Sequence, residues 1–134
     1  MTQIPHDTLV VVADGGQAVL YRNTARDSES PQLREERRLK PGQFSGQGPS
    51  GSRPEDQSVK QTAHATFIKE LAQTIEQMVA QKKAEHLVVI ADPTSLGEFR
   101  DAAHKSVQAA TIRTLSKDLT HESPAQIAKA LEKA

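Results

Sequence analysis

Apolar residues gather along this chain in short blocks, and their spacing separates strands from helices. Residues 8–13 and 86–91 are apolar runs without alternation, which is typical of strands buried on both faces of a sheet. Asp14-Gly15-Gly16 follows the first run and favours a hairpin, because glycine reaches the positive φ values that tight turns need. We therefore expect residues 17–22 to form the return strand, and residues 111–116 to form the last strand.

Residues 32–40 combine few apolar positions with many charges. As a strand, this segment places Leu33, Glu35, Arg37 and Leu39 on one face, and its charges suit an exposed edge strand. As a helix, it has no comparable apolar stripe. The pattern favours the edge strand.

Three helices are expected. The longest begins with Ser58 as its N-cap and ends near Lys83. The second opens at Asp92-Pro93 and ends near His104, and the last opens at Ser123-Pro124. Apolar residues at helical spacing form the stripes of the first and last helices: Phe67, Ile68, Leu71, Ile75, Met78 and Val79, then Ile127, Ala128 and Leu131. The order β-β-β-α-β-α-β-α predicts an α/β fold in which helices cover a mixed sheet.

A Gly/Pro-rich loop is expected at residues 41–57, which hold four of the seven glycines and three of the seven prolines. Regular structure is disfavoured there, and so long a loop in a compact domain is usually functional or disordered. The length of 134 residues predicts that 1–134 form a single domain around this loop.

Composition excludes several functional classes. The 17 cationic residues match the 17 acidic residues, so broad attraction to DNA or to an anionic membrane is not expected, although a local basic patch is compatible with this balance. Cysteine is absent, which excludes disulfides, thiolate catalysis and zinc–thiolate sites. No apolar run approaches the roughly 20 residues that span a bilayer, and no signal-peptide pattern opens the chain. We expect a cytoplasmic protein without membrane insertion, and the sequence predicts no oligomeric state.

Short motifs distributed along almost the whole chain resemble those of the bacterial host attachment protein family. They are Ile4-Pro5, Asp14-Gly15, Tyr21-Arg22-Asn23, Phe67, Leu87-Val88-Val89-Ile90-Ala91, Pro93, Leu96-Gly97, Arg100 and Lys117-Asp118-Leu119-Thr120. That family is similar to the middle domain of archaeal and eukaryotic class I release factors and of Pelota. The resemblance implies a five-stranded mixed sheet of the ribonuclease-H-like kind used by translation components.

Release factors carry a Gly-Gly-Gln tripeptide, on a loop before the long helix, whose glutamine helps water attack peptidyl-tRNA. The literal tripeptide Gly15-Gly16-Gln17 lies instead in the first hairpin, where Gly-Gly is ordinary turn chemistry. The corresponding loop holds Ser45-Gly46-Gln47-Gly48, in which Ser45 replaces the first glycine. Gln47 is the candidate catalytic glutamine, and His64 near the start of the long helix is a candidate general base.

The same loop and the strand before it offer a candidate surface for the ribosome or RNA. Its cations are Arg34, Arg37, Arg38, Lys40 and Arg53. Glu35 and Glu36 neutralise part of this charge, and Phe44 is its only aromatic residue for base stacking. The alternative is that residues 41–57 merely connect the strand to the helix.

A further hypothesis concerns two aspartates. If the first and fourth strands are parallel neighbours, Asp14 and Asp92 lie together at their carboxyl ends, where open α/β sheets place their sites. Two carboxylates hold Mg²⁺ or Mn²⁺ in phosphodiester hydrolysis. The competing interpretation, which local sequence favours, is that Asp14 begins a turn and Asp92 caps a helix.

The family resemblance, together with the long Gly/Pro-rich loop, implies a non-enzymatic, cytoplasmic interaction module that acts on or near the ribosome or tRNA and needs no cofactor. The alternatives are a hydrolase, acting through Gln47 or through Asp14 and Asp92, and an indirect regulator of attachment to host cells. The family-motif positions Asp14, Gly15, Pro93, Gly97, Arg100, Lys117 and Asp118 are further candidate site residues.

Overall fold

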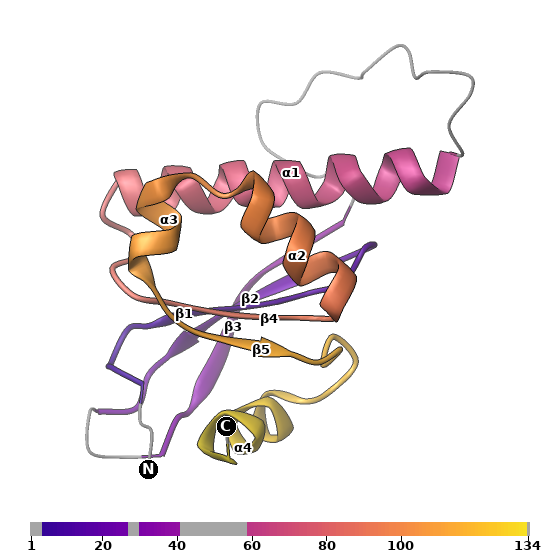
Figure 1. Ribbon diagram of the computed structural model, residues 1–134. Coiled ribbons are helices and arrows are strands. Elements are labelled where there is room, and N and C mark those ends of the chain that lie inside the picture. The colour runs from indigo at the N-terminus through magenta and orange to yellow at the C-terminus, as the bar shows by residue number, and fades with distance from the viewer. Residues whose placement is uncertain (1–3, 27–29, 41–58, 134) are drawn as a thin grey trace.

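A computed structural model of the chain describes residues 4–26, 30–40 and 59–133, with the side chains of residues 59–65 and 133 left undescribed. Five strands form one sheet in the order β3-β2-β1-β4-β5 (Figure 1). The strands are β1 (Leu9–Ala13), β2 (Ala18–Asn23), β3 (Leu33–Leu39), β4 (Leu87–Ala91) and β5 (Thr111–Ser116). The helices are α1 (Val59–Ala80), α2 (Pro93–Ala102), α3 (Lys105–Ala110) and α4 (Pro124–Lys133).

The sheet is mixed, as the sequence predicts. Strand β1 pairs antiparallel with β2 and parallel with β4, while β2 pairs antiparallel with β3 and β4 pairs parallel with β5. Every residue of the two central strands β1 and β4 is buried, which matches their unbroken apolar sequences. The predicted five-stranded α/β fold is therefore confirmed.

Helices cover both faces of the sheet. Helices α1, α2 and α3 lie on one face and α4 lies on the other (Figure 1). Because successive side chains of a strand point to opposite faces, Val11 contributes to the core under α1, whereas Val10 and Val12 contribute to the smaller core under α4. The predicted stripes are confirmed, since Phe67 and Leu71 of α1 and Leu131 of α4 are fully buried.

Helix α1 ends in a Schellman motif, which is the standard way to satisfy the last carbonyl groups of a helix. The backbone N–H of Lys82 donates to the Val79 carbonyl at 3.0 Å, and that of Lys83 donates to the Met78 carbonyl at 2.8 Å. Lys82 takes the left-handed conformation, with φ of 62°, that this motif requires. The helix ends close to the predicted boundary, and its predicted N-cap, Ser58, lies outside the described residues.

The segment after β4 corrects one prediction, because two short helices occupy it instead of a single helix to His104. Helix α2 stops at Ala102, and Ala103 turns to an extended conformation with ψ of 134°. His104 then caps α3, its Nδ1 accepting a hydrogen bond from the backbone N–H of Ser106 at 3.1 Å. Neither glycine nor proline marks this break, so the sequence pattern could not show it.

Candidate functional site

Strand β3 is the charged edge strand that the sequence predicts, but its faces are arranged differently. A register shift opposite Leu20 and Tyr21 places Arg37 opposite Leu20 and Glu35 opposite Tyr21, leaving Glu36 without a register partner. One extra residue reverses the alternation of side chains beyond it. Leu39 therefore packs in the core under α1, whereas Leu33 packs against the core under α4. The prediction of one shared face for Leu33, Glu35, Arg37 and Leu39 is wrong.

Ion pairs with glutamates neutralise part of the positive charge on β3. Arg38 donates from Nη2 to Glu35 Oε1 at 2.9 Å, and this hydrogen bond raises the pKa of Arg38 above its ordinary value. Arg22 of β2 binds both carboxylate oxygens of Glu36 at 3.1 Å. Arg34 approaches the same carboxylate at 3.8 Å. The two acidic residues of β3 are thus engaged by Arg38 and Arg22, with Arg34 at longer range.

Arg37 differs from its neighbours, because it forms no ion pair with any described residue. It is exposed and lines an open hollow of about 450 Å³ beside α1. The other lining residues are Leu20, Arg34, Glu35, Glu36 and Met78. Lys40 is exposed at the end of β3, directly before residues 41–58. Among the cations of β3, Arg37 is therefore one that no described carboxylate pairs within 4 Å, although Glu35 and Glu36 line the same hollow.

Three predicted site residues have side chains outside the described part of the structure. Gln47 and Arg53 fall outside the described residues, and His64 lies in α1 where side chains are not described. Their proposed roles stay predictions.

The Gly15-Gly16-Gln17 tripeptide forms the turn between β1 and β2. Asp14 Oδ1 accepts hydrogen bonds from the backbone N–H groups of Gly16 at 2.7 Å and Gln17 at 2.9 Å. The Asp14 N–H also donates to the Gln17 carbonyl at 2.9 Å. The interpretation of this tripeptide as turn chemistry is confirmed.

Asp14 and Asp92 follow the parallel neighbours β1 and β4, which pair Ala13 with Ala91, as the sequence hypothesis requires. Asp92 is the N-cap of α2, and its Oδ2 accepts from the Ser95 N–H at 3.2 Å. Its Oδ1 is buried and has no hydrogen-bond partner among the described residues. Within the part of the chain that the structure describes, no three histidine, cysteine, aspartate or glutamate residues are grouped to hold a metal ion.

A side-chain contact between Asp14 and the loop after β5 is not predicted by the sequence. The Thr120 hydroxyl lies 3.0 Å from Asp14 Oδ2 and 2.7 Å from Asp118 Oδ1, and Thr120 is almost fully buried. The spacing of Asp118 and Thr120 predicts only the local turn, in which the Thr120 N–H donates to Asp118 Oδ1 at 3.2 Å, and not the contact with Asp14. This contact gives part of the Lys117-Asp118-Leu119-Thr120 motif a structural role.

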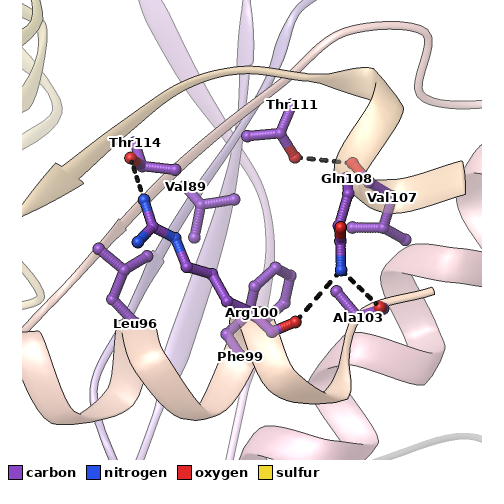
Figure 2. A pocket seen from close by; sticks show the side chains of 9 residues that line it. All are labelled: Val89, Leu96, Phe99, Arg100, Ala103, Val107, Gln108, Thr111 and Thr114. Carbon is purple, nitrogen blue, oxygen red and sulfur yellow. Dashed lines mark hydrogen bonds between the residues drawn. The ribbon is translucent and has the colours of Figure 1, made fainter. Parts of the chain in front are cut away.

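Three further motif positions, Pro93, Gly97 and Arg100, lie on α2. Pro93 occupies the first turn, and Arg100 in the last turn donates from Nη2 to the Thr114 hydroxyl of β5 at 3.1 Å (Figure 2). Gly97 is exposed, and a Cβ atom there would meet nothing within 4 Å. Close packing therefore does not explain this glycine.

Among the described helices, none combines the length and the apolar character that a membrane-spanning helix needs.

Comparison with known proteins adds a family and a fold relative. The model of a family described as "Bacterial archaeo-eukaryotic release factor family 12" matches residues 7–131. Among solved structures, the crystal structure of archaeal translation termination factor, aRF1, is similar, with a TM-score of 0.50 and 12% sequence identity. That similarity covers 94% of this chain and 39% of the archaeal chain, and it establishes a shared fold. No curated protein matches the sequence.

Proposed function

The chain belongs to the bacterial archaeo-eukaryotic release factor family 12, and from that premise we propose that it is a non-enzymatic module that binds the ribosome or tRNA. The observation that carries the proposal is the family match, which extends over residues 7–131 and so includes every strand. The archaeal termination factor, whose fold this chain shares over 39% of that factor's length, supports a role in translation. Action on the ribosome is consistent with a protein of zero formal net charge, because a specific docking surface needs only local charge.

The end of β3 is the proposed contact surface. Arg37 forms no ion pair with a described carboxylate, and Lys40 follows it at the end of β3, directly before residues 41–58. Arg34 keeps part of its charge available, since its carboxylate partner Glu36 already binds Arg22 more closely. Arg53, in the loop that follows, is a further proposed contact. Phosphate groups of RNA are the natural partners of such a surface, because guanidinium groups bind them through paired hydrogen bonds.

Sedimentation tests this proposal with the whole chain. Lysates from growing and from stressed cells are separated on sucrose gradients at low salt, and the native protein is detected in each fraction. We expect a portion to travel with ribosomes or their subunits, and to return to the light fractions at high salt because the contact is electrostatic. Absence of the protein from all ribosomal fractions under both growth conditions would contradict the proposal.

A hydrolase acting through Gln47 is the first alternative. The resemblance of Ser45-Gly46-Gln47-Gly48 to the release-factor loop motivates it, and His64 is its candidate general base. Purified protein is incubated with ribosomes that carry peptidyl-tRNA, and peptide release is measured for wild type and Gln47→Ala. Release that disappears in Gln47→Ala supports catalysis, and release that is unchanged rejects this assignment.

A metal-dependent nuclease that uses Asp14 and Asp92 is the second alternative. The parallel pairing of β1 with β4 supports it, as does the unpartnered, buried Oδ1 of Asp92. Against it, the Asp14 carboxylate already accepts two backbone hydrogen bonds in its turn and lies 3.0 Å from the Thr120 hydroxyl. Calorimetry with Mn²⁺ decides the matter: binding by wild type that Asp14→Asn abolishes supports a metal site, and no binding by wild type rejects it.

An indirect role in attachment to host cells is the third alternative, and it rests on the family resemblance alone. A deletion strain complemented with the wild-type chain would recover attachment. Unchanged attachment after deletion would reject this role.

A further inference from the structure

A pocket separate from the β3 surface lies between the two short helices and the sheet edge. Its volume is about 300 Å³, and β4, α2, α3 and β5 all contribute to its wall (Figure 2). The apolar part consists of Val89, Leu96, Phe99 and Val107, each of which is almost fully buried. A volume of this size is at the lower end of the range found for small-molecule sites.

One charged side chain lines this pocket. Arg100 reaches along the pocket wall to the Thr114 hydroxyl, to which its Nη2 donates at 3.1 Å (Figure 2). It forms no ion pair with any described residue, and no acidic residue lines the pocket. A guanidinium carries five N–H donors, so one neutral hydroxyl leaves both its charge and most of its hydrogen-bonding capacity available.

The other polar residues of the pocket are held by the backbone. The Thr111 hydroxyl donates to the Val107 carbonyl at 2.7 Å, and the Gln108 amide donates to the Ala103 carbonyl at 3.2 Å. The hydrogen bond from Gln108 joins α3 to the residue that ends α2. A pocket-lining side chain thus stabilises the break between these helices. The pocket is therefore preformed, and a ligand would pay little ordering cost to enter it.

We propose that this pocket binds a small amphipathic carboxylate, with the carboxylate on Arg100 and a short alkyl group against Val89, Leu96 and Phe99. A carboxylate suits a single guanidinium, because the two groups form paired hydrogen bonds and their unit charges balance. This site goes beyond the proposed ribosomal role and does not depend on it.

Titration with hexanoate, followed by amide chemical shifts of the full chain, tests the proposal. Hexan-1-ol is the matched probe, because it keeps the alkyl chain and lacks the charge. Wild type is expected to show saturable shifts centred on α2, α3 and β5, with a dissociation constant at least fivefold lower for hexanoate than for hexan-1-ol. Shifts that do not saturate, or equal affinity for the two probes, would overturn the proposal.

Two variants place the ligand. Arg100→Gln is expected to weaken hexanoate binding about tenfold, the factor that corresponds to losing one charge-assisted interaction. Lys105→Gln removes the same charge from α3 at a residue that does not line the pocket, so affinity is expected to stay within twofold of wild type. Thermal unfolding of both variants checks that the fold is retained, and Ala103→Leu, which fills the pocket, provides a second test should Arg100→Gln unfold. Affinity that is unchanged in Arg100→Gln, or in folded Ala103→Leu, would contradict this assignment.

Discussion

The Thr120 hydroxyl lies 3.0 Å from Oδ2 of Asp14, a residue 106 positions earlier in the chain. This contact joins the hairpin after β1 to the loop between β5 and α4. The same hydroxyl lies 2.7 Å from Oδ1 of Asp118, and it has only one proton to donate to the two carboxylates. Asp14 therefore supports the first turn through Oδ1 and anchors the C-terminal loop through Oδ2.

Replacing Thr120 with valine removes this hydroxyl while keeping the side-chain shape. We expect Thr120→Val to lower the free energy of unfolding by about 1.5 kcal/mol, because a buried hydrogen bond to a charged group is lost. Thr120→Ser retains the hydroxyl and is the matched control, with the smaller loss of one methyl group. Urea denaturation measures the free energy of unfolding of both variants. If Thr120→Val is as stable as Thr120→Ser, the hydroxyl contributes nothing to stability.

Gly97 occupies an exposed position inside α2, where glycine is a poor helix former. Since a Cβ atom there would meet nothing within 4 Å, Gly97→Ala is expected to raise the free energy of unfolding by about 0.5–1 kcal/mol. Denaturant titration of the variant measures this gain. Lower stability in Gly97→Ala would mean that the glycine serves a conformational need absent from this structure.

Lys82 presents the opposite case, because a residue with a side chain occupies the left-handed position that ends α1. Glycine adopts this conformation without the steric cost of a Cβ atom, so Lys82→Gly is expected to stabilise the protein by roughly 1 kcal/mol. The neighbouring exposed lysine offers a control, since Lys83→Gly removes the same charge outside the left-handed position. A gain of equal size in both variants would attribute the effect to charge instead of backbone conformation.

Glu70 on α1 makes the free energy of unfolding depend on pH. Partial burial raises the pKa of this carboxyl above its ordinary value of 4.5, so the folded state holds the proton to higher pH than the unfolded state does. Stability from this group consequently falls as pH rises from about 4.5 through the raised pKa, and the loss persists at neutral pH.

The variant Glu70→Gln removes this loss. We expect it to be slightly more stable than wild type at pH 7 and to lose that advantage near pH 4, where Glu70 is protonated in both states. Unfolding is measured at both pH values, with Glu76→Gln reporting the effect of removing a different negative charge from the same helix. An advantage of Glu70→Gln that is the same at both pH values would contradict the prediction.

The central part of the fold could be predicted from the sequence because each element there has a strong local signal. The apolar runs at β1 and β4 require burial on both faces, and the glycines after Asp14 require a turn. The stripe from Phe67 to Ile75 predicts which side of α1 is buried. In these elements, local preference and tertiary packing favour the same structure.

The remaining features depend on contacts that a linear pattern does not contain. The register shift in β3 follows from pairing with β2, so the sequence alone could not place Leu33 and Leu39 on opposite faces. The break between α2 and α3 depends on capping by His104, an uncommon N-cap residue. The pocket at Arg100 combines residues from four elements of the fold, and although Val89, Leu96 and Arg100 belong to the family motifs, their order along the chain does not show that they meet.

The candidate site was also predictable from the sequence only in part. The cations of β3 are visible in the sequence, but only the structure distinguishes Arg38, which binds Glu35, from Arg37, which has no described ion-pair partner. That difference identifies which charge is available to an anionic partner. It also supplies two substitutions on one strand whose effects on binding are expected to differ.

Direct binding of the purified protein to purified bacterial ribosomes, measured across a range of salt concentrations, tests whether the protein acts on the ribosome through Arg37. We expect wild type to bind at low salt, and Arg37→Gln to bind more weakly with a slope of log affinity against log salt reduced by about 0.7, the value of one phosphate contact with single-stranded nucleic acid. Arg38→Gln removes the same charge from a residue already paired with Glu35, and is expected to have a smaller effect. Wild type is expected to bind, and Arg37→Gln is expected to bind more weakly than Arg38→Gln. No binding by wild type at low salt would contradict a role on the ribosome, and equal binding by the two variants would contradict the placement of the contact at Arg37.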